Sequence, residues 1–158
     1  MVVREYRDAD LAEVVGVFTR AIHVLAVGHY DARQRAAWAP AAPDLPAWRS
    51  RLASQSVLVA DSDGVIAGFL AYTTDGHIDL LYCAPEFARH GVASALYERA
   101  QSVLDAAGAA AAYTEASLVA RPFFEARGFG VEAEQYVERG GVGFVRFAMR
   151  KPLTRTGP

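Results

Sequence analysis

Hydrophobic residues in the first part of the chain recur every three or four positions, the spacing of one face of an amphipathic helix. Six residues form this pattern: Leu11, Val14, Val15, Phe18, Ile22 and Leu25. Asp10 and Glu13 have the spacing of a capping box at the start of this helix, and Gly28 follows its end. Residues 2–6 precede it as a short β segment. The N-terminal part is therefore predicted to be a strand followed by a helix.

Residues 30–55 are less regular. Three prolines divide them into two short helical pieces: Pro40, Pro43 and Pro46. Three aromatic residues also gather here: Tyr30, Trp38 and Trp48. This segment either covers a binding site or forms a packed helical arm whose aromatic side chains belong to the core, and the sequence leaves both interpretations open.

From Ser56 the period changes to that of β-strands. Three apolar runs are separated by the pairs Asp63-Gly64 and Asp75-Gly76, and Asp-Gly between β runs is a strong hairpin signal. We therefore expect an antiparallel meander of three strands, over residues 56–60, 65–73 and 77–83.

A helical pattern then returns and ends at Gly108, carried by Val92, Leu96, Ala100, Val103, Leu104 and Ala107. A strand over 111–117, a short helix with Pro122 in its first turn, and strands near 129–137 and 143–149 follow. The strand–helix–strand connection from 77–83 to 111–117 should be a right-handed crossover between parallel strands. The predicted fold class is α/β, with a mixed, mostly antiparallel central sheet of about seven strands and flanking helices.

The 158 residues show no internal repeat or linker, so we expect one domain over 1–153 and a tail over 154–158. A formal net charge of −2 gives no electrostatic basis for binding nucleic acid or an anionic membrane. With no secretion signal at the N-terminus and no long apolar run, a cytoplasmic location is expected. The single cysteine, Cys83, excludes an internal disulfide, and no metal site is expected. Whether the protein forms a homodimer is left open.

A glycine stands where the helix after residue 91 is about to begin, in the run Ala88-Arg89-His90-Gly91-Val92-Ala93. Backbone N–H groups at a helix N-terminus are unpaired and carry partial positive charge. A pyrophosphate lying on residues 89–94 would satisfy several of them, and Gly91 and Ala93 would leave room for it. The alternative is a tight strand-to-helix turn with close packing.

The stretch "IDLLYCAPEFARHGVASALYERA" resembles motif A of the GNAT superfamily of acyl-CoA-dependent N-acetyltransferases, and "ASLVARPFFEARGF" resembles the second signature of that family. Ala88 stands where the family usually has Gln or Arg, and Phe124 replaces a frequent tyrosine. The resemblance implies acetyl-CoA as co-substrate and direct attack of a primary amine on its thioester. Eleven residues are implied at the cofactor: Leu81, Tyr82, Cys83, Arg89, His90, Gly91, Val92, Ala93, Ser94, Ser117 and Phe124. The pantetheine arm would pair with the backbone near Leu81–Cys83, where the sheet splays before the strand over 111–117.

Strand alternation places His77, Asp79, Leu81 and Cys83 on one face. GNAT enzymes often carry an acidic base on this strand, and Asp79 matches that position. A histidine titrates near neutral pH, which makes His77 a second candidate. Glu115, at the end of the next strand, is a third. Each of the three also has an ordinary structural interpretation, as a hydrogen-bonded carboxylate, a histidine beside a turn, or a charge at a strand end.

His23, Tyr30 and Trp38 are candidates for the acceptor pocket, with ordinary packing as the alternative. Phe124 cannot protonate the departing thiolate, so a tyrosine acid at that place is excluded. Two rivals to an acetyl-CoA-dependent N-acetyltransferase therefore remain. One is a transferase that uses another acyl-CoA, and the other is a catalytically silent GNAT-fold domain that binds acyl-CoA as a sensor or partner module.

Overall fold

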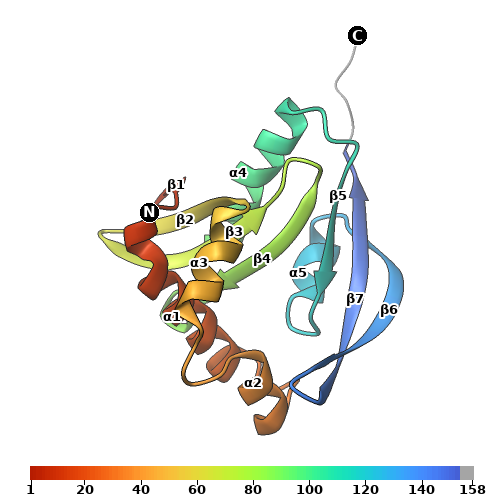
Figure 1. Ribbon diagram of the computed structural model, residues 1–158. Helices are drawn as coiled ribbons and strands as arrows, with labels where there is room; N and C mark the ends of the chain where they lie inside the picture. The colour runs from red at the N-terminus through yellow and green to blue at the C-terminus, as the bar shows by residue number, and fades with distance from the viewer. Residues whose placement is uncertain (154–158) are drawn as a thin grey trace.

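A computed structural model describes residues 1–153, and the predicted tail over 154–158 lies outside this part. Within it, seven strands form one sheet in the order β1-β2-β3-β4-β5-β7-β6 (Figure 1). Their bounds are β1 Val2–Glu5, β2 Ser56–Ser62, β3 Val65–Tyr72, β4 His77–Cys83, β5 Ala111–Ala116, β6 Gly130–Arg139 and β7 Val142–Pro152. The pair β4–β5 is parallel and the five other pairs are antiparallel. The predicted fold class, the meander and the parallel crossover are all confirmed.

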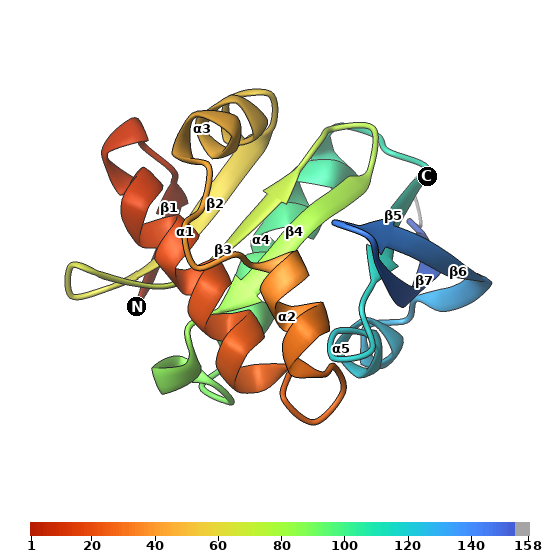
Figure 2. The same cartoon turned by 60° about the horizontal axis from the view of Figure 1, so that its bottom comes forward.

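Five α-helices flank the sheet in the described residues: α1 Leu11–Arg20, α2 Ala32–Trp38, α3 Leu45–Ala53, α4 Val92–Ala106 and α5 Arg121–Ala126. A π-helical turn, Ala21–Leu25, extends α1. The buried face of α4 joins one core cluster, which also holds Phe124 of α5, and α1 packs into a second cluster on the opposite face. Figure 2 shows α1, α2 and α3 on the side of the sheet opposite to α4.

The capping box predicted for Asp10 and Glu13 is not formed. Asp10 occupies the N-cap position of α1, but its carboxylate accepts hydrogen bonds from the backbone N–H of Arg7 and from the guanidinium of Arg4 instead. The Glu13 carboxylate reaches across to the backbone N–H of Ile66, at 2.7 Å. Both acids therefore tie α1 to the sheet, and tertiary partners have replaced the local ones.

A β-bulge interrupts β4 at Asp79. Ala71 of β3 pairs with Leu80, but the next residue, Tyr72, pairs with Ile78, so Asp79 has no partner in the register. After the bulge, Leu81 and Cys83 pack toward the cluster with α4, whereas Asp79 contacts α3 on the other face. The prediction that His77, Asp79, Leu81 and Cys83 share one face is therefore wrong, because strict alternation does not continue through a bulge.

The strands β4 and β5 are paired only at their beginnings, where His77 pairs with Tyr113 and Ile78 with Thr114. Beyond these two pairs they diverge, and the sheet opens between them (Figure 1). The turn before β4 contributes to this junction, since the backbone N–H of Tyr113 donates to the carbonyl of Gly76 at 3.0 Å.

Replacing Gly76 by alanine is expected to destabilise the protein, because an added Cβ would lie 2.0 Å from the carbonyl oxygen of Ala111 and the residue has φ +113. Gly64 is the matched control, since it also has a positive φ, +87, but open space around it. Both variants carry a backbone cost of about 1–2 kcal/mol, and only Gly76→Ala adds the collision with β5. Thermal unfolding should give a clearly lower Tm for Gly76→Ala than for Gly64→Ala; equal Tm values would contradict this.

Candidate active site

The edge of β4 that faces the opening carries free backbone groups. The N–H of Ala84 donates to the carbonyl of Ala67 on β3 at 2.8 Å. In an antiparallel pair, alternate residues direct their N–H and C=O toward the partner strand. Ala84, Tyr82 and Leu80 therefore bond to β3, while the backbone groups of Leu81 and Cys83 point into the opening, where an extended ligand could pair with them.

The start of α4 forms a cradle for an anion. Gly91 is the N-cap with φ +78, and Arg89 also has a positive φ, +64. The amides of residues 91–94 have no carbonyl partner within the helix. A Cβ placed on Gly91 would meet nothing within 4 Å, so the space above it is open. The N–H of His90 is already used, since it donates to the carbonyl of Phe87 at 3.2 Å.

Two cavities meet at the opening between β4 and β5. The first, which we call the thiol-side cavity, is largely apolar and runs from the start of α4, with Ile22, Cys83, Ala93 and Phe123 in its wall. The second, which we call the acceptor cavity, lies on the face covered by α2 and α3 and is lined by both acids and arginines, among them Asp79 and Glu115. Leu81, Tyr82, Trp38, Ser117 and Ala120 line both cavities, so the two adjoin across the splayed strands.

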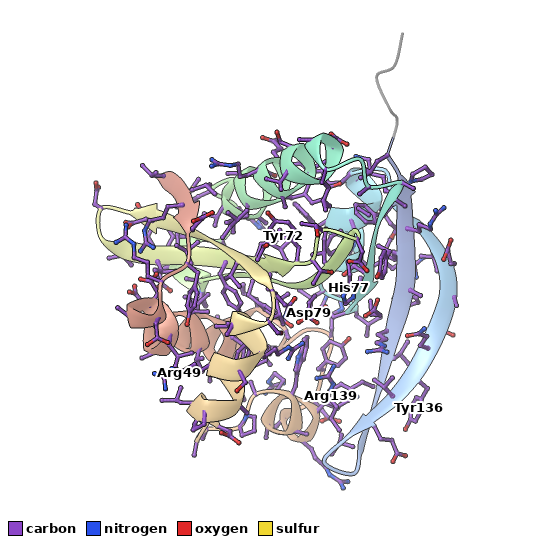
Figure 3. The ribbon with its side chains drawn as sticks, turned by 45° about the horizontal axis from the view of Figure 1, so that its top comes forward. Arg49, Tyr72, His77, Asp79, Tyr136 and Arg139 are labelled. Carbon is purple, nitrogen blue, oxygen red and sulfur yellow. The ribbon has the colours of Figure 1, made fainter. Side chains whose placement is uncertain are left out.

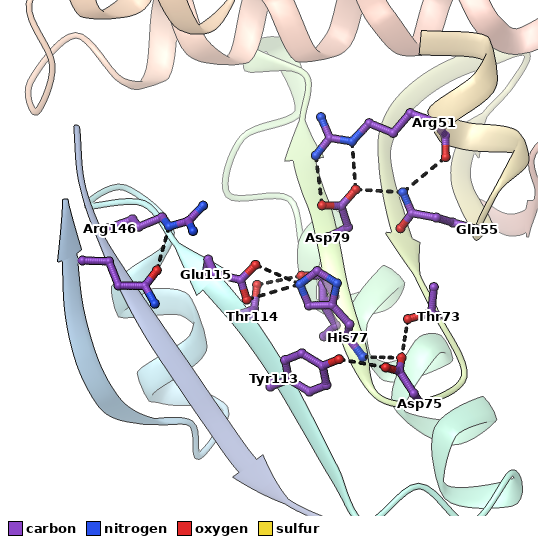
Figure 4. Close-up of polar contacts among 12 residues, drawn as sticks. Arg51, Gln55, Thr73, Asp75, His77, Asp79, Tyr113, Thr114, Glu115 and Arg146 are labelled. Atoms are coloured by element: carbon purple, nitrogen blue, oxygen red, sulfur yellow. Dashed lines mark hydrogen bonds and ion pairs between the residues drawn. The ribbon is translucent and has the colours of Figure 1, made fainter. Parts of the chain in front are cut away.

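Asp79 is held by α3. Arg51 makes a two-pronged contact with its carboxylate, both bonds at 2.9 Å, and Gln55 adds a third at 2.7 Å (Figure 4). Burial raises the pKa of Asp79, but the hydrogen bonds from Arg51 and Gln55 outweigh it and hold that pKa below its ordinary value. Asp79 is therefore an ionised carboxylate whose oxygens are already occupied.

His77 and Glu115 form a pair across the β4–β5 junction. Nε2 of His77 lies 3.0 Å and 3.2 Å from the two carboxylate oxygens of Glu115. The imidazole also stacks on the ring of Tyr113, whose hydroxyl donates to Asp75 at 2.8 Å (Figure 4). Glu115 lines the acceptor cavity directly and His77 stands behind it. The sequence separates these two residues by 38 positions, and the parallel pairing brings them together.

Aromatic side chains shape the roof of the acceptor cavity. The hydroxyl of Tyr30 makes two hydrogen bonds: it donates to the carbonyl of Val145 and accepts from the backbone N–H of Leu118. Trp38 packs edge-on against Tyr30. Burial raises the pKa of Tyr82 to about 12, so its hydroxyl keeps its proton throughout the physiological range. The two aromatic residues predicted for the acceptor pocket, Tyr30 and Trp38, do line this cavity.

Other predicted site residues lie elsewhere or have local partners. His23 does not line either of these two cavities, and its Nε2 lies 2.7 Å from the carbonyl of Ala39. Ser117 lines both, while its hydroxyl accepts from the N–H of Ala120, in the turn before α5. The Phe124 ring is buried at the edge of the acceptor cavity. Val92 is buried too, so only its backbone faces the cradle.

Sequence reasoning missed four polar residues of this region. Arg51 lies on α3 and Gln55 follows the end of that helix; their spacing of four residues could have indicated a shared partner. Arg139 and Arg146 line the acceptor cavity from β6 and β7, and no motif marks them. In the described residues no group of three or more His, Cys, Asp or Glu could hold a metal ion, and none of the helices is long and apolar enough to cross a membrane.

Cys83 should react slowly with thiol reagents. It is half-buried in the wall of the thiol-side cavity, and burial raises its pKa to about 11. At pH 8 about 0.1% of such a thiol is thiolate, the reactive form. We expect alkylation of the folded protein to be about 100-fold slower than that of the chain unfolded in denaturant, and the rate to rise with pH up to about 11. Since Cys83 is the only cysteine, the signal is unambiguous, and equal rates would contradict the expectation.

Comparison with known proteins agrees with this geometry. The family model for the acetyltransferase (GNAT) domain matches residues 26–151. The uncharacterized N-acetyltransferase YafP of Escherichia coli K12 is 35% identical over 151 residues, 94% of this chain and 93% of the relative. Among solved structures, a GCN5-related N-acetyltransferase from Rhodopseudomonas palustris, described as a class-II aminotransferase, superposes with a TM-score of 0.92 at 31% identity, covering 96% and 95% of the two chains.

A more distant structure extends the comparison of the fold. The PaiA N-acetyltransferase of Thermoplasma acidophilum, in complex with coenzyme A, has a TM-score of 0.74 at 18% identity, over 96% of this chain and 98% of that chain. The resemblance found in the two sequence motifs is thus confirmed. This chain belongs to the GNAT family of acetyltransferases, enzymes whose co-substrate is acetyl-CoA.

Proposed function

We propose that this enzyme transfers the acetyl group of acetyl-CoA to a primary amine by direct attack of the amine on the thioester. The observation that carries the proposal is the continuity of the site. An anion cradle at the start of α4, an apolar passage, and a cavity with a carboxylate in its wall meet at the opening between β4 and β5.

The cofactor would be held mainly by backbone groups. The pyrophosphate fits the amides of Gly91, Val92, Ala93 and Ser94, with Arg89 and His90 at its rim. The pantetheine arm would pair like a strand with Leu81 and Cys83, whose N–H and C=O face the opening. Leu81 lines both cavities, and its N–H is the donor best placed for the thioester oxygen, on which negative charge grows during attack.

Glu115, supported by His77, is the base that the geometry favours. An alkyl ammonium of pKa about 10.4 is almost wholly protonated at neutral pH and cannot attack until a proton leaves. Glu115 faces the acceptor cavity, and within residues 1–153 its carboxylate is hydrogen-bonded to the side chain of His77 alone. Asp79 also lines the cavity, but it would have to give up contacts with Arg51 and Gln55 to accept a proton.

The transfer then balances as follows. The nitrogen gives up two protons in all. The first passes through Glu115 and His77 to solvent before attack. The N–C bond to the acetyl group then forms, the C–S bond breaks, the second proton passes from nitrogen to Glu115, and the sulfur leaves as a thiolate. Phe124 offers no proton to that sulfur. Tyr82, which lines both cavities and whose hydroxyl stays protonated, is a candidate donor of a hydrogen bond to it.

Thiol release from acetyl-CoA with a panel of amines tests this function. We expect release that depends on both the amine and the enzyme, with an acetylated amine as the product in mass spectrometry. Calorimetry with acetyl-CoA and with a longer acyl-CoA runs alongside. Binding without any turnover would instead support the acyl-CoA sensor, for which the absence of a tyrosine at position 124 is the supporting observation, and preferred turnover of the longer acyl-CoA would correct the donor.

A further inference from the structure

The positive and negative charges of the side chains that line the acceptor cavity do not cancel. Five of them line it: Arg51, Asp79, Glu115, Arg139 and Arg146. Arg51 and Asp79 neutralise each other through their two-pronged contact. Two guanidinium groups, on Arg139 and Arg146, then share the cavity with one carboxylate, Glu115, which already faces His77. The cavity therefore carries an excess of positive charge.

Neither of these arginines has an acidic partner within residues 1–153. Nε of Arg146 donates to the neutral side-chain oxygen of Gln135 at 2.8 Å, and its two terminal nitrogens make no other side-chain contact there. The side chain of Arg139, at the end of β6, makes no hydrogen bond or ion pair in the same range of residues, and its charge acts on Tyr82. Gln135 thus fixes the Arg146 side chain while leaving most of its donors unused.

The strand register puts these groups on one surface. Arg146 is paired with Gln135, and alternation along β6 brings Gln135, Val137 and Arg139 to the same face. Glu115 is paired with Ala148, so Arg146 is its diagonal neighbour on that face, at about 7–8 Å between backbones. Figure 4 shows Glu115 and Arg146 projecting from the neighbouring strands β5 and β7, and Figure 3 shows Arg139 beside α2.

A guanidinium with free donors is suited to one class of ligand. Its planar fork matches the two oxygens of a carboxylate or phosphate, and such charge-assisted bonds are among the strongest in proteins. The apolar side chains of Val137 and Phe144 also line the cavity, and Phe144 packs against Tyr30 and Trp38. The cavity thus brings together an acid, two arginines whose side chains have no acidic partner within residues 1–153, and apolar surface.

We propose that the acceptor is a compact amine that also carries a carboxylate, with the carboxylate on Arg146 and Arg139 and the amine near Glu115. The inference rests on the proposed function, whose acceptor class it names. An amino acid or a related amino carboxylate has the required charges within the spacing of Glu115 and Arg146. A polyamine would bring a second positive charge toward the arginines and is disfavoured.

The test compares amino acids with their own carboxamides as acceptors for thiol release, together with one polyamine. Removing the carboxylate lowers the pKa of the ammonium group, so the amide is intrinsically the better nucleophile near neutral pH. Preference for the acid would therefore report recognition of the carboxylate. We expect kcat/KM to be about 10- to 100-fold higher for the acid of the preferred pair, the scale of lost charged hydrogen bonds.

Arg146→Gln and Arg139→Gln should each reduce this acid-to-amide ratio, with acetyl-CoA affinity unchanged. Arg150→Gln is the matched control, because Arg150 lies on the same strand and the same face, opposite Tyr113, but outside the cavity wall. Arg150→Gln should leave the acid-to-amide ratio of kcat/KM unchanged. A ratio near or below one in the wild type, or one that survives both cavity variants, would overturn the proposal.

A binding measurement separates this inference from the proposed function. Trp38 lines the acceptor cavity, so its fluorescence, in a Trp48→Phe background, can report acid and amide binding to the protein saturated with CoA. Acid-selective binding that depends on Arg146, without turnover of any amine, would leave the carboxylate site on the arginines standing and refute the transferase. Turnover of amines with no preference for the acid would support the transferase and refute the carboxylate site.

Discussion

Replacement of Gly91 by valine is expected to lower the affinity for acetyl-CoA by about 10²–10⁴-fold while leaving the protein folded. The Cβ of residue 91 would project into open space at the start of α4, where the pyrophosphate is proposed to lie. At least two charge-assisted hydrogen bonds to backbone amides would be lost, each worth about 1.5–3 kcal/mol. Isothermal titration calorimetry with acetyl-CoA measures the effect directly.

Gly108 provides a control on the same helix. It follows the other end of α4 with φ +76, against φ +78 for Gly91, and at both positions a Cβ would meet nothing within 4 Å. Gly108→Val therefore carries a similar backbone cost, and both variants should lose similar stability in thermal unfolding. Only Gly91→Val should lose acetyl-CoA affinity. Unchanged calorimetric affinity in a folded Gly91→Val protein would refute the placement of the phosphates.

Local signals were enough to predict most of the fold. The Asp63-Gly64 and Asp75-Gly76 pairs fix two hairpins, and His77–Cys83 forms a strand with the predicted bounds. What the sequence did not indicate is the bulge at Asp79. A bulge shifts the alternation by one residue, but residues 80–83 are apolar at every position, so the shift leaves no mark in the sequence and only the partner strand reveals it. The sequence also did not indicate the partner of Asp10. Its carboxylate binds the guanidinium of Arg4 and makes no capping hydrogen bond to α1.

The part of the candidate site that consists of backbone groups within a sequence motif was predictable. The part formed by side chains from different strands was much less so. Gly91 follows from the glycine at the start of a predicted helix, and the backbone around Leu81 is implied by the resemblance to motif A. The contact between Glu115 and His77 depends on the parallel pairing of β4 and β5, which the sequence indicated only as topology. Arg146 belongs to a strand whose face toward the cavity is set by pairing with β5 and β6, so its role could not be inferred from its position in the chain.

A loss of about 10²–10⁴-fold in kcat is expected for Glu115→Gln, the usual contribution of a positioned general base. Glutamine keeps the size of the side chain and a hydrogen bond to His77, but it cannot accept the proton from the amine. Acetyl-CoA affinity should stay within a few-fold of the wild type, because the cofactor is proposed to be held by backbone groups of β4 and α4. Steady-state thiol release and calorimetry measure the two quantities separately.

Asp79→Asn is the matched control, since Asp79 lines the same cavity but is bound to Arg51 and Gln55. Its folded-state pKa lies below the ordinary value, so its ionised form stabilises the fold above that value, and this contribution is lost as pH falls through the lowered pKa. Asp79→Asn should therefore reduce stability at neutral pH, and the difference from the wild type should shrink in acid. Its effect on kcat should be much smaller than that of Glu115→Gln. If Asp79→Asn instead abolishes turnover while Glu115→Gln retains it, the base is Asp79 and the carboxylate facing His77 is structural.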